Sequence, residues 1–468
     1  MSSKAASVKT EKQEPNWIDT VPPKVKEVFL AAIKAHSAKK YNEAINHYTM
    51  ALSLLPDDPV LLTNLGVALR AQDRFKASEA CYRRAIAVKP DSPGAYSNLG
   101  NVLRRLGRLK EAVACHRRAV ELDRKFIDAY YNLGLVLQDM GKLDEAIRLF
   151  NHCLKFKPGD DRINWDKSLA QLAKGDFVNG FELYEYRWKR EEITARHFRQ
   201  PLWDGSSLKD KTIFVYSEQG FGDTLNFCRY LPLVAETGGK VVFECQPELL
   251  SLLEGMDGVH KVIAGGDRIP DFDVQIPLIS LPRIFQHDID SIPRQCPYIK
   301  PPGDAGFPVH VPQGTKFKVG IVWAGKPTHK NDHNRSVSIE NFLPLASIPG
   351  VTLYSLQKGP ETAQREESGC GFLVRELGSG CEDFADTAKI MAQLDLIITV
   401  DTSVAHLAGA LNLPVWVAIP YNPDWRWMRK RKDSPWYPSM TLFRQKNPGD
   451  WTPVFNKILS ELKRKINS

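Results

Sequence analysis

Small and apolar residues return at a fixed interval along the first third of the chain. The triplet Asn-Leu-Gly begins at positions 64, 98 and 132, and glycines recur at 107, 141 and 175, in each case 34 residues apart. The dipeptide Glu-Ala at 43, 111 and 145 and the prolines at 56, 90 and 158 keep the same phase. A period of this length indicates stacked repeats, in which each unit buries its apolar face against the next. The pattern therefore predicts a solenoid.

The repeat resembles the tetratricopeptide (TPR) family, in which a small residue in the first helix of each unit lets the second helix pack closely and a proline ends the unit. We divide the predicted solenoid, residues 21–192, into units at about 23–56, 57–90, 91–124, 125–158 and 159–192. In the fifth unit Ser168 replaces the glycine of the signature, as expected for a terminal unit whose outer face meets another domain. The resemblance implies an α-solenoid with a concave, peptide-binding side.

The hydrophobic pattern changes after residue 205, where short apolar runs alternate with helical sequence. Strands are expected at 211–216, 240–244, 273–277, 318–323, 352–356, 396–400 and 415–419, and a helix over 224–235. Alternation of this kind favours parallel, doubly wound sheets. We expect two Rossmann-like α/β halves, residues 205–310 and 316–468, which face a cleft and are joined through a proline-rich linker. Residues 1–20 are expected to form a disordered tail.

Composition, net charge and the lengths of apolar runs exclude several classes of protein. Apolar residues make up 43% and charged residues 25% of the 468, which is typical of a folded globular protein. The net charge of +8 favours small anionic ligands over nucleic acid. No apolar run approaches the ~18 residues of a transmembrane segment and no secretory signal is recognisable, so a cytoplasmic protein is expected. The eight cysteines lack metal-ligand spacing and are interpreted as free thiols.

A strand-to-helix turn at 400–406 is the first candidate site. Asp401, Thr402 and Ser403 follow a predicted strand and are residue types that begin helices. The N-terminus of the following helix would present N–H groups and a partial positive charge, which suit a phosphate or diphosphate. An ordinary capped helix accounts for the same residues equally well.

The loop at 217–223 is the second candidate site. A dinucleotide-binding fingerprint needs a third glycine after Gly220 and Gly222, but Leu225 stands there, so no nicotinamide cofactor is expected. The two glycines let the backbone turn sharply and present Asp223 above the end of the strand, where ligands of open α/β sheets bind.

These two segments resemble the heptosyltransferase-like (family 9) glycosyltransferases, which have the GT-B fold. The run D-T-S-V-A-H-L-A-G-A-L at 401–411, followed by Pro414, is similar to their donor-binding segment, although Gly usually stands where Ser403 does. The run S-E-Q-G-F-G-D-T-L at 217–225 is similar to their first acceptor-side loop. The likeness covers about 211–445, and with the repeats the layout is similar to bacterial TPR-containing protein glycosyltransferases, including those acting on flagellin. It implies donor contacts from Asp401, Thr402, Ser403 and His406, and an acceptor-side loop shaped by Gly220 and Gly222.

The implied reaction suggests roles for further residues. Asp223 is the candidate general base, since a carboxylate can take the proton of an acceptor hydroxyl while the sugar C1 is attacked; an inert N-cap of the helix beginning at Thr224 is the alternative. Departure of a nucleoside diphosphate leaves negative charge that cations can stabilise in place of a metal. The cationic candidates are Lys326, Lys330 and Arg335, in the loop after one predicted strand. Gln357 and Lys358, just after another predicted strand, are candidates for contact with the nucleotide. For the basic loop a solvated charged surface is the alternative.

Two further clusters are interpreted structurally. Tryptophans at 416, 425, 427 and 436 favour aromatic packing over a platform for a base or sugar. The basic run at 429–432 favours a solvated face over a nucleic-acid site.

The sequence thus predicts a nucleotide-sugar-dependent, inverting glycosyltransferase that needs no metal and no cofactor besides its donor substrate. Its acceptor is expected to be a protein recruited by the repeats. The alternatives are a non-catalytic TPR adaptor with a degenerate GT-B module, and a transferase acting on lipopolysaccharide or another glycan. In that last case the repeats would have no evident role.

Overall fold

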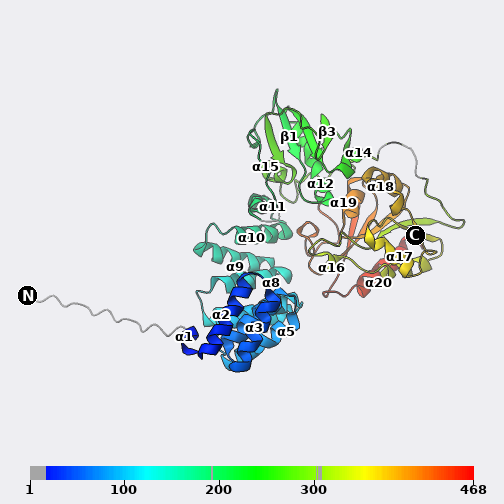
Figure 1. The fold of residues 1–468 in the computed structure, drawn as a ribbon. Helices are drawn as coiled ribbons and strands as arrows, with labels where there is room; N and C mark the ends of the chain where they lie inside the picture. The colour runs from blue at the N-terminus through cyan, green and yellow to red at the C-terminus, as the bar shows by residue number, and fades with distance from the viewer. Residues whose placement is uncertain (1–16, 191–192, 302, 304–307, 468) are drawn as a thin grey trace, which may run out of the picture. The chain divides into compact units, whose positions relative to one another are not determined.

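A computed structural model describes residues 17–190, 193–301, 303 and 308–467 (Figure 1). The chain divides into two compact units, Met1–Pro158 and Gly159–Ser468. The described part of the first unit is helical, whereas the second contains two β-sheets.

The first unit is built from helix pairs whose periods match the sequence repeat. Its helices are α1 (Trp17–Thr20), α2 (Pro23–Ser37), α3 (Tyr41–Leu54), α4 (Pro59–Ala71), α5 (Phe75–Val88), α6 (Pro93–Arg105), α7 (Leu109–Leu122), α8 (Ile127–Asp139) and α9 (Leu143–Phe156). The predicted helical solenoid is confirmed for this unit. Of the predicted disordered tail, residues 1–16 lie outside the described residues. For Trp17–Thr20 the prediction is wrong, because the indole of Trp17 packs on Phe29 with ring centroids 4.9 Å apart and donates to Asp58 over 2.9 Å.

The repeated glycine is explained by a close approach inside each helix pair. A Cβ atom added to Gly66 would lie 2.8 Å from the ring of Tyr82, and one added to Gly134 would lie 2.7 Å from Phe150. At the equivalent place in the middle repeat the partner of Gly100 is His116, which is fully buried. The 34-residue period therefore records a contact between a small residue and a ring.

The fifth predicted repeat belongs to the second unit. It consists of α10 (Asp161–Lys174), α11 (Phe177–Tyr184) and a 3₁₀ turn at Glu185–Lys189. Phe177 and Phe181 are 1% exposed and share one hydrophobic core with the strands of the first sheet. The expectation that the outer face of the terminal repeat meets another domain is confirmed.

The rest of the second unit contains two parallel sheets. The first has the strand order β3-β2-β1-β4 and the second the order β10-β9-β8-β5-β6-β7. Their strands are β1 (Thr212–Tyr216), β2 (Lys240–Cys245), β3 (Lys261–Ala264), β4 (Val274–Pro277), β5 (Phe317–Val322), β6 (Val351–Ser355), β7 (Val374–Glu376), β8 (Leu396–Val400), β9 (Val415–Ile419) and β10 (Met440–Arg444). The seven predicted strands are confirmed within about two residues, and β3, β7 and β10 are additional.

Helices connect the strands and pack on both sheets. They are α12 (Phe221–Phe227), α13 (Leu231–Ala235), α14 (Leu250–Leu253), α15 (Leu281–Phe285), α16 (Asp332–Arg335), α17 (Ala363–Glu367), α18 (Phe384–Met391), α19 (Ser403–Ala410) and α20 (Thr452–Asn467). The helix predicted over 224–235 is instead α12 and α13 with a 3₁₀ turn between them, and it begins earlier, at Phe221. Helices α12 and α19, which follow strands of different sheets, pack against each other (Figure 1).

The tryptophan-rich segment is part of the core of this unit. Trp425, Trp427 and Trp436 are at most 5% exposed, and Phe177 of α11 stacks on Trp436 with ring centroids 5.2 Å apart. The interpretation as aromatic packing is confirmed for these three residues.

Candidate functional site

Three of the candidate residues follow strands that flank the two places where the strand order reverses. In the first sheet the order reverses beside β1, and in the second it reverses between β5 and β8. Ligands of open α/β sheets bind beyond the carboxyl ends of the strands at such switch points. The segments after β1, β5 and β8 carry Asp223 in α12, Arg335 in α16 and Asp401 in the turn before α19, respectively. Three of the predicted site residues, Asp223, Arg335 and Asp401, thus lie after the carboxyl ends of strands in the second unit, where ligands of such sheets bind.

The N-terminus of α19 is separated from the end of β8 by two residues. Thr402 has an extended backbone (φ −140°, ψ 172°), and among the described residues no side chain caps this helix. Its hydroxyl instead pairs with that of Thr399 over 3.1 Å, while Ser403 is partly exposed. The first N–H groups of a helix need an acceptor when no side chain supplies one. An anion is a suitable acceptor there.

Arg335 lies beside this helix start. Its Nη1 donates to the carbonyl oxygen of Asp401 over 3.0 Å, and its Nε donates to Asp332 over 3.2 Å. A Cβ atom on Gly325 would collide with the guanidinium, so this glycine makes room for it. The side chain is 14% exposed and held in place, as a fixed cationic contact requires. Lys326 and Lys330, from the same loop, lie at the surface.

Asp223 lies in the first turn of α12. The alternative prediction, that Asp223 is the N-cap of this helix, is wrong, because the helix begins two residues before it. One carboxylate oxygen accepts the backbone N–H of Gly220 over 2.9 Å, and the other accepts a hydrogen bond from Arg426. Burial raises the pKa of this carboxyl, while the charge of Arg426 acts in the opposite direction. The carboxylate is therefore oriented on both oxygens.

Arg426 is the main residue that the sequence interpretation missed. It bridges Asp223 and Asp424, to which its Nη1 donates over 2.9 Å, and it lies over the ring of Trp425 at 4.3 Å. It is 6% exposed, and its Nε has no partner among the described residues. The signal was available, because the segment follows β9 as the other candidates follow their strands.

Asp401 is a second carboxyl with a raised pKa. Burial and the neighbouring charge of Asp424 raise the pKa to about 6, against the opposing effect of Arg335. In the loop after β5, partial desolvation and the charge of Arg335 lower the pKa of His329, although its side chain is exposed. Shifted pKa values gathered at the strand ends of an α/β unit mark a candidate functional site.

His406, which is a predicted contact of the donor phosphate, is buried beside Trp427 and Tyr437. It is 6% exposed, stacks on Trp427 at 5.0 Å and shares a hydrogen bond of 2.9 Å with Tyr437. Burial and nearby arginines lower its pKa well below the ordinary value, so the ring is neutral at pH 7. A Cβ atom on Gly222 would lie 2.8 Å from the same ring. His406 and Gly222 therefore form a packing contact between α19 and α12.

Gln357 and Lys358 lie at the end of β6. The amide of Gln357 accepts from the N–H groups of Trp323 and Ala324 (3.1 and 3.0 Å) and donates to the carbonyls of Ala324 and Lys358 (3.0 and 2.9 Å). The Lys358 ammonium donates to the carbonyl of Cys381. Gln357 is thus fully used in joining the ends of β5 and β6. This geometry favours a positioning role for it.

The described residues contain no group of three or more His, Cys, Asp or Glu side chains that could hold a metal ion. None of the helices in the described ranges combines the length and apolarity needed to cross a membrane.

Comparison with known proteins places the repeats in a family. Residues 57–125 and 91–158 match the tetratricopeptide repeat family. The chain is 24% identical over 331 residues to Protein FlbA of Caulobacter vibrioides, an alignment covering 64% of this chain and 55% of FlbA. It therefore spans about half the length of that curated relative. Because 64% of 468 residues exceeds the first unit, the likeness extends into the second.

Solved structures with some similarity include the MamA protein and PilW, a type IV pilus biogenesis factor. MamA is 23% identical with a TM-score of 0.32, and the match covers 37% of this chain and 97% of MamA. PilW is 18% identical with a TM-score of 0.35, covering 37% of this chain and 81% of PilW.

Proposed function

We propose that the chain is a nucleotide-sugar-dependent glycosyltransferase whose repeats recruit a protein acceptor. One observation supports the donor site above all: the uncapped N-terminus of α19 and the fixed guanidinium of Arg335 adjoin at the carbonyl of Asp401. Backbone N–H groups and a rigid guanidinium are complementary to a diphosphate, since both donate to phosphoryl oxygens. The resemblance of 401–411 to a donor-binding segment supports the same assignment.

The chemistry follows from these positions. The acceptor hydroxyl oxygen attacks C1 of the donor sugar, the bond between C1 and the phosphate oxygen breaks, and the nucleoside diphosphate leaves with the bonding electrons. Arg335 and the α19 N–H groups stabilise the charge that develops on the phosphate. Asp223 takes the hydroxyl proton, and Arg426 with the N–H of Gly220 orients its carboxylate. Direct displacement inverts the configuration at C1.

Acceptor recruitment is assigned to the first unit. Tetratricopeptide repeats match residues 57–158 and lie in the same chain as the proposed transferase site. Tethering a binding surface to a catalytic site raises the local concentration of the acceptor without any new contact at the reacting atoms.

The donor site is tested by isothermal titration calorimetry with UDP, GDP, ADP and CMP, with and without EDTA. At least one nucleotide should bind the parent in EDTA, and Arg335→Ala should weaken that binding by about one to two decades, since a hydrogen bond to a charged group contributes ~1.5–3 kcal/mol. Arg375→Ala is the matched control, because this arginine is exposed on β7, away from the strand ends described above. Equal losses in the two variants, or no binding by any nucleotide, would contradict the donor site.

A partner-binding protein without transferase activity is the second candidate. The observation that favours it is the engagement of both oxygens of Asp223 by Arg426 and Gly220. Nucleotide binding without release of sugar from any donor, at any acceptor concentration, would favour this candidate over the first.

A further inference from the structure

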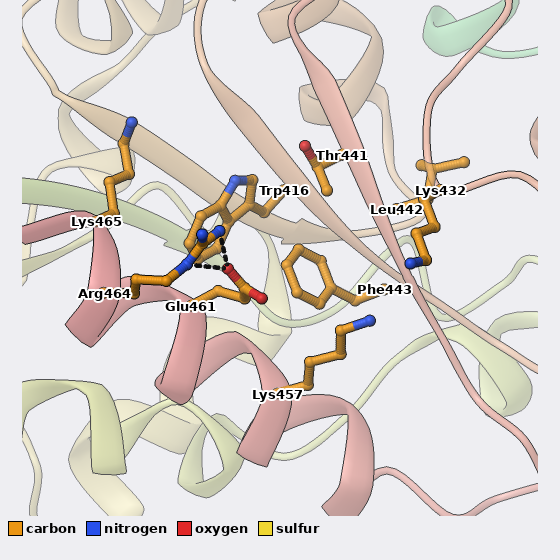
Figure 2. A pocket seen from close by; sticks show the side chains of 9 residues that line it. All are labelled: Trp416, Lys432, Thr441, Leu442, Phe443, Lys457, Glu461, Arg464 and Lys465. Carbon is orange, nitrogen blue, oxygen red and sulfur yellow. Dashed lines mark hydrogen bonds and ion pairs between the residues drawn. The ribbon is translucent and has the colours of Figure 1, made fainter. Parts of the chain in front are cut away.

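A separate groove lies on the second unit, between α20 and the strands β9 and β10. It has a volume of about 490 Å³ (Figure 2). In Figure 2 the helix forms one side, and Trp416, Thr441 and Phe443 project from the strands on the other. The groove shares no lining residue with the site at the strand ends.

The groove is strongly cationic. Lys457, Arg464 and Lys465 come from α20, and Lys432 comes from the segment that borders β10. Glu461 is the single acidic residue of the lining, and Arg464 donates to it over 2.6 and 3.0 Å. Four cations and one anion give 4 − 1 = +3. The α20 residues are spaced i, i+4, i+7 and i+8, which places them on one helix face.

Aromatic rings lie beneath these charges. Trp416 is partly exposed, and its ring packs against that of buried Phe443 with centroids 5.2 Å apart at 48°. The ammonium of Lys457 lies over Phe443 at 5.8 Å. An indole face bordered by cations can accept a flat ring that is joined to an anionic group, since the ring stacks while the cations attract the anion.

We propose that this groove binds a nucleoside polyphosphate at a second site, independent of the one proposed for the donor. The volume lies within the range of ~300–1,000 Å³ for small-molecule sites. Lysines act as point charges that suit a polyphosphate chain, and the partly exposed face of Trp416 suits the base.

An acidic peptide fits the groove less well. A peptide usually gains affinity at a sheet edge by adding a strand. Here the outer side of β10 is already in use, because Asp433 forms an antiparallel bridge with Thr441 and the N–H of Leu442 donates to the carbonyl of Lys432 over 2.7 Å. The groove therefore offers a ligand its charged side chains and no free strand edge. A compact polyanion needs only the side chains to bind.

The test is calorimetry on the chain carrying Arg335→Ala, which weakens the proposed donor site and leaves the groove intact. The probes are ATP, inorganic tripolyphosphate and adenosine. ATP is expected to bind at least tenfold more tightly than either of the others. The double change Lys432→Glu and Lys457→Glu should weaken ATP binding at least tenfold, since it reverses two charges of the groove.

Lys463→Glu is the matched control, since Lys463 is exposed on α20 and does not line the groove. It should leave ATP affinity within twofold of the background. The proposal would be overturned if ATP and tripolyphosphate bound with equal affinity, or if a polyglutamate peptide bound more tightly than ATP. It would also be overturned if the double variant and Lys463→Glu lost ATP affinity equally. Circular dichroism confirms that the variants fold. If the parent chain bound no nucleotide at the proposed donor site, the outcomes expected for the groove would be unchanged. The two proposals can therefore be rejected separately.

Discussion

Asp401 holds a charge in surroundings that disfavour it. Burial and Asp424 raise its pKa to about 6, above the ordinary value of 3.8. The folded chain therefore binds more protons than the unfolded chain between these values, and stability falls as the pH rises through them. Retaining an unfavourable charge at this position is consistent with a functional demand, because active sites often sacrifice stability.

Asp401→Asn should accordingly stabilise the second unit at pH 8 and lose that advantage near pH 4. The neutral amide has the same shape and no charge to bury. Thermal unfolding at the two pH values measures the difference, with Asp271→Asn as control, because Asp271 is exposed. Equal shifts in melting temperature at both pH values would show that the Asp401 carboxyl is not perturbed.

We expect His116 to make the repeats less stable in acid. Burial lowers its pKa to about 4, and both ring nitrogens lack partners among the described residues. An unfolded histidine titrates near ~6.5, so the unfolded state binds the extra proton between these values. Stability should fall by about 3 kcal/mol as the pH drops from 6.5 to 4.

His116→Phe should remove most of this dependence, since Phe150 fills the equivalent place in the next repeat. Hydrogen exchange of the α6 and α7 amides, corrected for the intrinsic effect of pH, reports the local stability. A parent whose corrected protection is the same at pH 7.5 and pH 5 would contradict the prediction.

The position of a single residue could be predicted where it follows a recognisable strand, but its contacts with distant parts of the chain could not. Asp223, Arg335 and Asp401 could be placed at strand ends because the strands were recognisable. The burial of His406 and the closed hydrogen bonds of Gln357 depend on partners far away in the chain, Tyr437 and Trp323, which no local pattern identifies. The place of Arg426 after β9 was visible in the sequence, but its partner Asp223 lies 203 residues earlier and could not be identified from a local pattern.

At the scale of elements, a buried ion pair attaches the last helix pair to the first sheet. Arg187 is fully buried and donates to both oxygens of Glu218 over 3.0 and 2.8 Å, and also to Ser280 over 2.7 Å. Glu218 belongs to the loop that also presents Asp223. The helix pair therefore supports one wall of the candidate site.

Arg187→Met should destabilise the second unit by about 3–5 kcal/mol, because it leaves the Glu218 carboxylate buried without its cation. Adding Glu218→Gln should recover part of that loss. Arg294→Ala, at an exposed pair with Asp290, should change stability by less than about 1 kcal/mol. Urea unfolding of the three variants measures these differences, and a neutral Arg187→Met would show that the pair does not hold the elements together.

The strands that escaped prediction are short or lie at edges. β3 and β7 have four and three residues, too few for an alternating pattern to stand out. β10 is the edge strand next to β9, and its sequence M-T-L-F-R includes an exposed threonine. Fully buried strands such as β8 were predictable, because a continuous apolar run rich in β-branched residues is typical of a strand buried on both faces.

At the scale of the whole molecule, the boundary of the units falls one repeat earlier than the repeat pattern suggests. A chain starting at Gly159 retains α10 and α11 and should fold and bind nucleotide as the parent does. A chain starting at residue 193 loses Phe177, Phe181 and Arg187 and should not fold stably, because these residues are fully buried against the sheet. Circular dichroism and calorimetry on both fragments check this. Folding of the shorter fragment with full affinity would contradict the boundary.

The most direct measurement of transferase activity is the intact mass of acceptor proteins that co-purify with the chain, taken after incubation with a panel of nucleotide sugars. We expect a mass increase of one or more glycosyl units with at least one donor. We also expect a rate ~10²–10⁴-fold lower with Asp223→Asn, because positioned proton transfer contributes about that much. No mass increase with any donor, or an unchanged rate with Asp223→Asn, would contradict the proposed function.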